Sequence, residues 1–251
     1  MFPYKDDNPT ILKPIVTLGI IALNVLAWIL VQGAGRPEAV AASVCQLGLI
    51  PGEVLGTVAT GTAVPLGPGM SCVIETPHYA TVLTSMFMHG GWLHLIGNMW
   101  FLWLFGNNIE DAMGHIRFVF FYLICGTAAA AAQVLTDSHG LVPMVGASGA
   151  ISGVMGAYLV RYPRVRVHTL LVLGFFVTRV TLPAYVMLGY WFVLQLLLGT
   201  AGTLSKVHGG VAFWAHVGGF VAGLVLIKVF ANPDLTRPRV DQGGAAEWLG
   251  T

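Results

Sequence analysis

Five polar side chains lie within strongly apolar stretches of the chain, and together they could carry out acyl transfer. They are His89, His94, Asn98, Ser148 and His216. A serine hydroxyl becomes a nucleophile when an imidazole within about 2.6–3.2 Å takes its proton. Side-chain amide and imidazole N–H groups can stabilise the oxyanion that forms in such a reaction. The set therefore predicts a nucleophile at Ser148 and a general base at His216. Asn98 and His94 would donate to the oxyanion.

The predicted nucleophile lies in the sequence Gly-Ala-Ser-Gly-Ala-Ile-Ser-Gly at residues 146–153. This is not the G-x-S-x-G nucleophile elbow, because Ala150 stands at the position of its last glycine. A serine at the start of a helix gains from the positive end of the helix dipole, and free N–H groups there can bind an oxyanion. The alternative is purely structural. In that case Ser148 caps the helix, and Gly149 and Gly153 serve in helix packing.

The predicted base is followed by two glycines one helical turn apart, Gly219 and Gly223. Taken alone, His216 could equally be an interior histidine held by hydrogen bonds. Small residues let two membrane helices approach closely, and such an approach would bring His216 to Ser148. No acidic residue lies at this depth to orient the histidine, which predicts a catalytic dyad rather than a triad.

The composition is that of a membrane protein. Of the 251 residues, 56% are hydrophobic and only 9% are charged, whereas soluble domains carry about 25% charged residues. These values exclude a disordered protein, a nucleic-acid binder and an ordinary cytosolic enzyme. The net charge of +1 gives no reason to expect an acidic partner. The lipid bilayer is therefore the expected environment.

Six apolar segments are candidates for membrane spans, since about 20 such residues cross the hydrocarbon core. Together they predict an all-α fold, a polytopic bundle of six transmembrane helices. A further apolar stretch, residues 167–177, covers only half a span and is expected to be interfacial or re-entrant. The six segments are residues 14–31, 89–105, 118–135, 148–160, 182–199 and 210–230.

The positive charges predict the orientation of this bundle. With the N-terminus inside, ten of the twelve Lys and Arg residues fall in cytoplasmic segments, as the positive-inside rule requires. Residues 14–230 would form the six-span domain, with a long outer loop at 32–78. Residues 1–13 and 231–251 would be cytoplasmic tails. The first apolar segment is expected to be a retained anchor rather than a cleaved signal peptide.

In this topology the five polar residues all fall in the outer half of the bilayer. His94 and Asn98 lie roughly 7 and 13 Å beyond His89 along a helix. They are four residues apart and share one helix face. The spacing of five between His89 and His94 does not align them on a straight helix, so residues 90–91, both glycine, are expected to permit a bend.

The cysteines leave one alternative open. Cys45 and Cys72 share the predicted outer loop, where they form either a disulfide or two unpaired thiols. No C-x-x-C pair indicates a zinc or redox site.

A metal or haem protein is disfavoured because the His residues lack the i, i+4 spacing of a chelating pair. A transporter is disfavoured because no charged residue lies in the middle of a span.

These motifs resemble those of the rhomboid family of intramembrane serine proteases, in its compact six-span bacterial form. The similarity covers about residues 14–230, and four segments carry it. They are HGGWLHLIGN at 89–98, GNNIED at 106–111, GASG at 146–149 and AHVGGFVAG at 215–223.

The resemblance implies a role for each matched residue. Ser148 would be the nucleophile and His216 the base. The oxyanion hole would consist of Asn98, His94 and the Ser148 backbone amide, and His89 would support it. The glycines that would support the nucleophile or the packing of the helices are Gly146, Gly149, Gly153, Gly219 and Gly223.

The resemblance also implies the substrate. The enzyme would be a serine endopeptidase of the bacterial inner membrane, active as a monomer and without metal or cofactor. It would cut single-span membrane proteins near the outer face, with the fifth span and residues 200–209 as gate and cap. Some members have an aromatic residue where this chain has Ser152, which leaves open what packs on His216. The alternative function is a catalytically silent rhomboid-like protein that binds client transmembrane helices.

Overall fold

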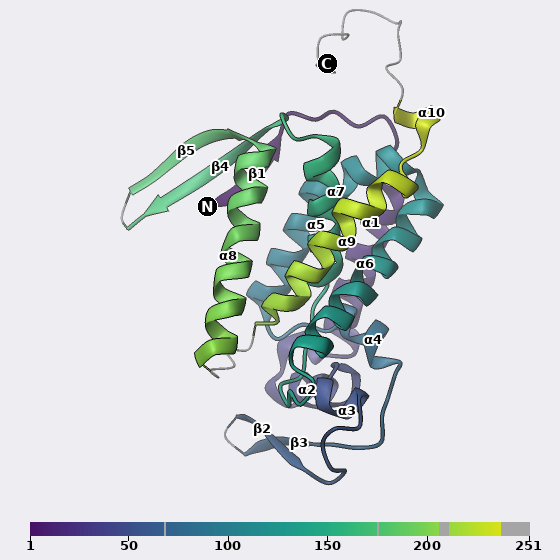
Figure 1. The fold of residues 1–251 in the computed structure, drawn as a ribbon, viewed down its shortest axis with the longest axis vertical. Coiled ribbons are helices and arrows are strands. Elements are labelled where there is room, and N and C mark those ends of the chain that lie inside the picture. The colour runs from purple at the N-terminus through teal and green to yellow at the C-terminus, as the bar shows by residue number, and fades with distance from the viewer. Residues whose placement is uncertain (68, 175, 206–210, 237–251) are drawn as a thin grey trace, which may run out of the picture.

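The computed structural model of the protein describes residues 1–67, 69–174, 176–205 and 211–236, and its main feature is a bundle of long helices (Figure 1). The helices that form the bundle are α1 (Ile15–Leu30), α5 (Trp92–Met113), α6 (His115–Thr136), α7 (Ser148–Arg161), α8 (Ala184–Ser205) and α9 (Phe213–Phe230). Each helix overlaps one of the six apolar segments of the sequence, although α5 and α8 end eight and six residues later than predicted. The predicted helical membrane bundle is therefore confirmed.

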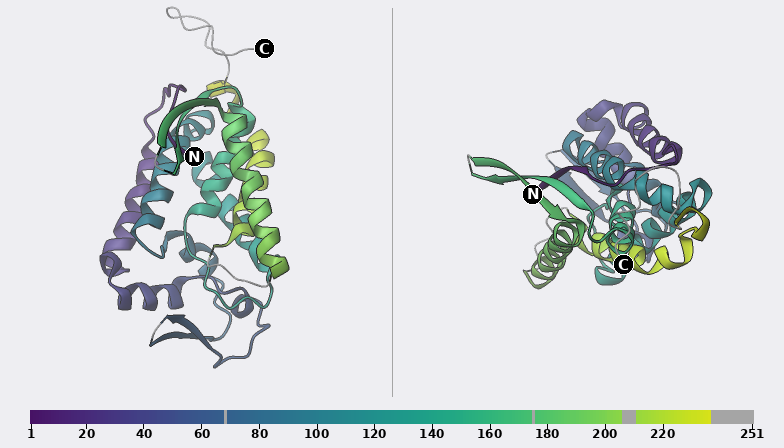
Figure 2. Two further views of the ribbon diagram at one scale, coloured as in Figure 1. Left: turned by 90° about the vertical axis from the view of Figure 1, so that its left-hand side faces the viewer. Right: turned by 90° about the horizontal axis from the view of Figure 1, so that it is seen from above.

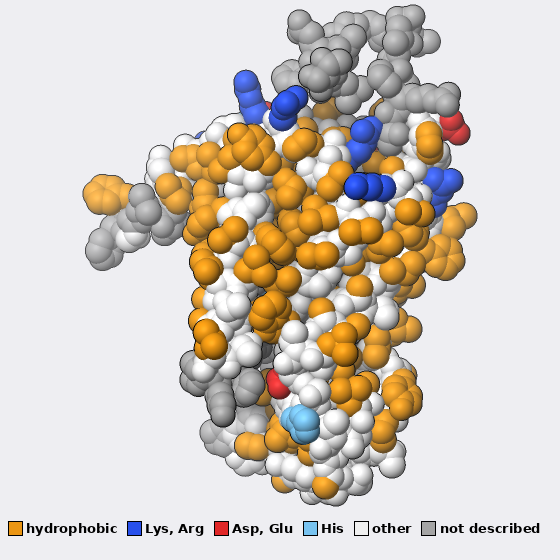
Figure 3. Space-filling model, in the orientation of Figure 1, with side chains coloured by type: hydrophobic (Ala, Val, Ile, Leu, Met, Phe, Trp, Pro, Cys, Tyr) orange, Lys and Arg blue, Asp and Glu red, His pale blue; other side chains and the backbone are white. Residues whose placement is uncertain are grey.

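The helices of the bundle differ in how well their length and composition fit a membrane span. Among the described residues, α6, α8 and α9 are long and apolar enough to cross a bilayer, and α1 is a shorter apolar helix of 16 residues. Hydrophobic side chains cover the visible face between the two ends of the bundle, and Lys and Arg gather near the end that carries α10 (Pro233–Thr236) (Figure 3). The count of six crossings stays a prediction.

Smaller elements lie at both ends of the bundle (Figures 1 and 2). One end carries a three-stranded antiparallel sheet in the order β1-β4-β5. Its strands are β1 (Phe2–Asp6), β4 (Arg166–Leu173) and β5 (Phe176–Pro183). The other end carries helices α2 (Pro37–Leu47), α3 (Pro51–Val54) and α4 (Thr81–Thr84), the 3₁₀ turns η1 (Gly33–Gly35) and η2 (Ser85–Phe87), and the hairpin of β2 (Ala63–Gly67) and β3 (Met70–Val73).

The β4–β5 hairpin replaces the interfacial or re-entrant segment expected at residues 167–177. Its register runs from the pair Arg166 and Pro183 to the pair Leu173 and Phe176. The segment is rich in β-branched and aromatic residues, which favour strands. Gly174 lies in the turn between the strands with φ of +58°, a backbone conformation that residues with a side chain rarely adopt. A short apolar run does not distinguish strand from helix by periodicity alone, and this is why the hairpin was not predicted.

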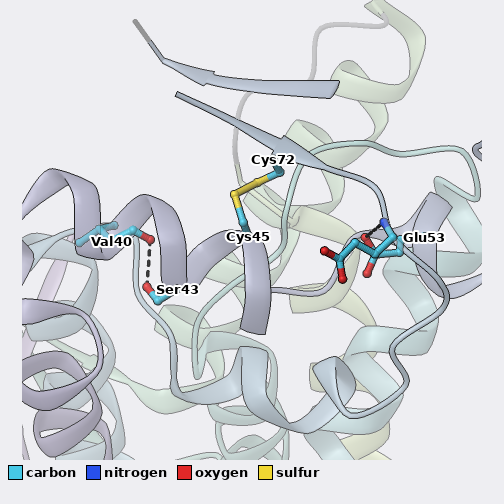
Figure 4. The surroundings of a disulfide bond; sticks show 6 residues. Val40, Ser43, Cys45, Glu53 and Cys72 are labelled. Atoms are coloured by element: carbon cyan, nitrogen blue, oxygen red, sulfur yellow. Dashed lines mark hydrogen bonds between the residues drawn. A yellow bond between two sulfur atoms is a disulfide. The ribbon is translucent and has the colours of Figure 1, made fainter. Parts of the chain in front are cut away.

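A disulfide joins Cys45 of α2 to Cys72 of β3, with their Cα atoms 5.3 Å apart (Figure 4). This result decides between the two states that the sequence left open. Cys72 packs with Ile50, Val64 and Ile74 in a small hydrophobic core of its own. The segment that precedes the second long helix thus contains a small folded core closed by a disulfide.

Helix α7 lies at the centre of the bundle and packs against α5, α6, α8 and α9. Every residue from Gly149 to Tyr158 is buried. Cβ atoms built on Gly219 and Gly223 of α9 would collide with the carbonyl oxygens of Gly149 and Gly153 of α7. The two backbones are therefore in direct contact, as small residues at a membrane helix interface allow.

The acidic end of α5 anchors α1. The buried Glu110 carboxylate accepts hydrogen bonds from the backbone N–H groups of Val16 (2.9 Å) and Thr17 (2.7 Å). These are first-turn donors of α1 that no helix can satisfy internally, and a negative charge there is favoured by the helix dipole. The Nδ1 atom of His115 lies 2.6 Å from the same carboxylate. One side chain thus connects the start of α1, the end of α5 and the start of α6.

Candidate active site

Ser148 is the first residue of α7, and the turn before it depends on a glycine. Gly146 has φ of +123°, a conformation that residues with a side chain rarely adopt. Its N–H donates to the Ser85 carbonyl at 2.9 Å, which ties the turn to η2. A Cβ atom on Gly146 would lie 2.7 Å from Nε2 of His94. The sequence before the serine therefore leaves room for the His94 ring beside it.

His216 lies in the first turn of α9, opposite the start of α7. Its Nε2 atom is 2.8 Å from the Ser148 hydroxyl oxygen. The two residues are 68 positions apart in the sequence and meet because α7 and α9 are packed through their glycines. The structure thus brings the predicted nucleophile and the predicted base into direct hydrogen-bonding contact.

The second ring nitrogen of His216 also has a partner. Nδ1 lies 2.9 Å from the side-chain carbonyl oxygen of Gln195, in α8. A carbonyl oxygen only accepts, so Nδ1 must carry the proton. Nε2 is then the unprotonated nitrogen, and it can accept from the Ser148 hydroxyl.

Helix α8 also provides the aromatic ring that packs on the histidine. The ring centroids of Trp191 and His216 are 5.8 Å apart, and the planes are tilted by 40°. Ser152, which occupies the position of an aromatic residue in some family members, instead donates to the Ser148 carbonyl at 2.6 Å. This arrangement answers the question that the sequence left open about His216.

His94 and Asn98 lie on one face of α5, as their spacing predicted, and both line the cavity that contains Ser148. Asn98 is 7% exposed and its Nδ2 atom is buried, so the amide N–H groups are shielded from bulk solvent. Its Nδ2 atom has no hydrogen-bond partner among the residues that the structure describes. A buried amide donor without a partner, in the same cavity as the Ser148 hydroxyl, is available to a reacting oxygen.

His89 lies before α5 rather than on it, because the helix begins only at Trp92. The glycine pair at 90–91 thus ends the preceding loop and does not bend the helix, contrary to expectation. The backbone of His89 is held by the side chain of Gln32, which donates to its carbonyl (2.8 Å) and accepts from its N–H (2.8 Å). The buried His89 ring packs edge-on against His94, with centroids 5.1 Å apart.

The cavity has a volume of about 360 Å³ and contains both Ser148 and His216. Its apolar lining comes from several helices, including Leu93 and Phe101 of α5, Trp191 of α8 and Ala215 of α9. A site that is mainly apolar with a few convergent polar groups is typical of ligand and substrate pockets. Among the residues that the structure describes, no group of three His, Cys, Asp or Glu side chains is arranged to hold a metal ion.

Sequence reasoning missed three residues of this site, namely Gln32, Trp191 and Gln195. Gln195 carried a usable signal, since it is a polar residue inside the apolar segment 182–199. It also lies one helical turn after Trp191 and so shares its face. The sequence prediction expected a hydrogen-bonding partner of His216 only from an acidic residue, so the amide of Gln195 was not predicted.

Comparison with known proteins shows the family of this chain. The model of the Rhomboid domain matches residues 76–233, which contain every residue of the site except Gln32. The chain belongs to the rhomboid family. Its apolar helices and this rhomboid domain make it a multi-pass integral membrane protein.

Individual rhomboid proteins are similar over the same region. RHOMBOID-like protein 5 of Arabidopsis thaliana is 30% identical over 173 residues, which is 67% of this chain and 52% of that protein. Rhomboid protease GluP of Bacillus subtilis (strain 168) is 30% identical over 147 residues, 59% of this chain and 24% of that protein. The mitochondrial Presenilin-associated rhomboid-like protein of Mus musculus is 35% identical over 89 residues, 34% of this chain and 23% of that protein. The chain thus spans about half the length, or less, of these curated relatives.

Proposed function

We propose that this rhomboid protein is an intramembrane serine endopeptidase with Ser148 as nucleophile and His216 as general base. The observation that carries the proposal is the 2.8 Å contact between the Ser148 hydroxyl and Nε2 of His216 inside a cavity lined by residues of α5, α7, α8 and α9. This distance is within the range needed for proton transfer from an attacking hydroxyl. Similarity to Rhomboid protease GluP gives independent support.

The proposed reaction is an acylation of Ser148 followed by hydrolysis of the acyl-enzyme. The Ser148 oxygen attacks the carbonyl carbon of the scissile peptide, and its proton passes to Nε2 of His216. When the tetrahedral intermediate collapses, the imidazolium returns this proton to the leaving amine. Water then attacks the acyl-enzyme in the same way, with His216 again as base, and releases the Ser148 hydroxyl.

The oxyanion of each intermediate would be stabilised by three donors. Asn98 offers a buried amide Nδ2 atom, and His94 lines the same cavity. The backbone N–H of Ser148 is the first of α7, so it has no partner inside the helix. Donors that are preorganised toward a developing negative charge contribute strongly to acyl transfer. In this proposal His89 supports the site through its contact with His94.

We propose single-span membrane proteins as substrates. The cavity lining includes side chains of both α5 and α8, such as Phe101 and Trp191, so an extended peptide could reach Ser148 from between these helices. Rhomboid proteins act on transmembrane substrates, which agrees with the apolar character of this lining. Catalysis needs no second chain, because both members of the dyad come from one protomer.

The proposed topology has six crossings with both termini in the cytoplasm of a bacterium, in its inner membrane. Lys and Arg gather near the α10 end of the bundle, as the positive-inside rule requires of the cytoplasmic side (Figure 3). The disulfide lies at the opposite end, which suits the oxidising side of such a membrane. Residues 14–230 would then be the six-span domain and residues 32–78 the outer segment. Residues 1–13 and 231–251 would be cytoplasmic tails, of which 237–251 lie outside the described residues.

The test is cleavage of a model single-span protein by the purified protein in liposomes. The wild type should cleave it, whereas Ser148→Ala and His216→Ala should abolish cleavage without loss of folding. Ser71→Ala and His139→Ala, at exposed positions, are matched controls that should keep full activity. Cleavage that survives Ser148→Ala would refute the proposal. A wild type that binds the substrate but never cuts it would instead indicate the silent, client-binding alternative.

A further inference from the structure

Helix α8 touches the predicted catalytic histidine with two side chains from a single face. Trp191 and Gln195 are four residues apart, so they point in the same direction from the helix. Trp191 packs on the imidazole ring, and Gln195 bonds its Nδ1 atom at 2.9 Å. The His216 ring, whose Nε2 faces Ser148, thus has two defined neighbours from α8.

The identity of the atom at Nδ1 decides which proton state His216 adopts. The oxygen of Gln195 accepts, so the neutral imidazole must be protonated at Nδ1 and bare at Nε2. Only this tautomer can accept a proton from the Ser148 hydroxyl 2.8 Å away. The opposite tautomer would present an N–H to that hydroxyl and could not act as a base.

We infer that Gln195 is a positioning residue that fixes His216 in the tautomer and orientation needed to activate Ser148. This inference rests on the proposed function and deepens it. The hydrogen-bonded series Gln195, His216, Ser148 would work as a triad in which an amide takes the place of a carboxylate. An amide orients the ring without adding negative charge to the apolar interior, where an ionised carboxylate is costly.

The position of α8 matters for the proposed base. Ser148 and His216 come from α7 and α9, which are joined backbone to backbone at their glycines. Gln195 and Trp191 come from a helix outside this pair (Figure 1). A displacement of α8 would therefore weaken the base while leaving the contact between α7 and α9 in place.

The opposing interpretation is that Gln195 bonds His216 only to satisfy its own amide in an apolar setting. A polar side chain at membrane depth needs a partner in any case. Under this interpretation, replacing Gln195 by an apolar residue of similar size would leave the reaction unchanged. The two interpretations therefore predict different kinetics.

The experiment compares Gln195→Leu and Gln195→Glu with the wild type in liposomes, with Leu197→Ala as control. Leu197 is on the same helix and 60% exposed, so its substitution should change nothing in the reaction. Gln195→Leu should lower kcat by about 10- to 100-fold with KM nearly constant. Gln195→Glu should retain activity, and the acidic limb of its pH profile should move up by about one pH unit or more, because a carboxylate favours the protonated imidazole.

A second readout needs no substrate. In ¹⁵N-histidine NMR spectra, the His216 signals, assigned by their loss in His216→Ala, should report the Nδ1–H tautomer in the wild type and a mixture in Gln195→Leu. Wild-type kcat and an unchanged tautomer in folded Gln195→Leu would overturn the inference. If Gln195→Leu does not fold, an unchanged pH profile in Gln195→Glu would overturn it.

The failure of the proposed function would look different. It would be seen as an inactive wild type, or as activity that persists in Ser148→Ala, whatever the outcome at Gln195. The tautomer measurement would still test the role of Gln195 in holding His216. The proposed protease function and the positioning role of Gln195 are therefore tested by separate observations.

Discussion

Gly223 of α9 lies directly against the backbone carbonyl of Gly153 of α7, so close that a Cβ atom at Gly223 would collide with it. One turn toward the site, Gly219 meets Gly149 in the same way. These contacts set the separation of the two helices just below Ser148 and His216. The hydrogen bond between the two side chains is therefore a consequence of glycine packing.

Widening this interface should disable the site. Gly223→Val would force α7 and α9 apart, and we expect a loss of stability of about 1–3 kcal/mol together with a marked fall in activity. Gly189→Ala is the matched control, since a Cβ atom there would meet nothing within 4 Å. Thermal unfolding and cleavage rate, measured on both variants, test this. Full activity in folded Gly223→Val would contradict the packing argument.

Removing the amide of Asn98 should slow the chemical step. We expect Asn98→Ala to lower kcat by about 10²-fold or less, because the other oxyanion donors remain. KM should change little, since the interaction strengthens mainly in the transition state. Ile96→Ala, at a 53% exposed position on the same helix, is the control. Equal rates for the two variants would exclude Asn98 from the oxyanion hole.

The disulfide should contribute to stability and not to catalysis. The bond between Cys45 and Cys72 spans 27 positions of sequence, and closing a loop of this size stabilises a folded protein by roughly 3 kcal/mol. The double variant Cys45→Ser, Cys72→Ser should therefore unfold at lower temperature, with kcat nearly unchanged. A reductant should lower the unfolding temperature of the wild type but not that of the variant. Identical unfolding temperatures for the two proteins would count against this role.

The attachment of β1 should depend on pH. Burial raises the pKa of the Asp6 carboxyl from 3.8 to about 6, although a hydrogen bond from Tyr158 and the charge of Lys5 act in the opposite direction. Because the folded protein holds this proton more tightly, its stability should fall as pH rises from about 4 to about 6 and level off above.

The variant Asp6→Asn isolates this effect, because it cannot ionise. Its unfolding temperature should vary less than that of the wild type between pH 4.5 and 7.5. Asp234→Asn, which removes an exposed carboxyl, should keep the wild-type pH dependence. If Asp6→Asn and the wild type show the same dependence, Asp6 does not carry it.

Much of the fold could be predicted because a helix that crosses lipid must be long enough and apolar enough to do so. The segments 14–31 and 118–135 became α1 (Ile15–Leu30) and α6 (His115–Thr136) with small shifts. The start of α5 was placed three residues early, since apolarity continues through His89 while the glycines at 90–91 interrupt the helix. The β4–β5 hairpin was missed because its apolar run lacks a distinguishing period.

Part of the site could be predicted because serine and histidine side chains have few roles at membrane depth. Ser148 and His216 were predicted as nucleophile and base from the polarity of their side chains and the glycines around them, and the structure brings them within 2.8 Å. Gln195 was missed because its role depends on the rotation of α8, which places it toward His216 and not toward lipid. Sequence spacing alone does not fix this rotation, because packing against neighbouring helices sets it.

The most direct test of the account is whether His216 activates Ser148 chemically. A fluorophosphonate reagent forms a bond from its phosphorus to the oxygen of an activated serine, with loss of fluoride, while the serine proton passes to the base. Peptide mass analysis of the labelled protein should show the adduct at Ser148 in the wild type and little or none in His216→Ala. An adduct at Ser148 that forms equally fast in His216→Ala, or none at Ser148 in the wild type, would contradict the account.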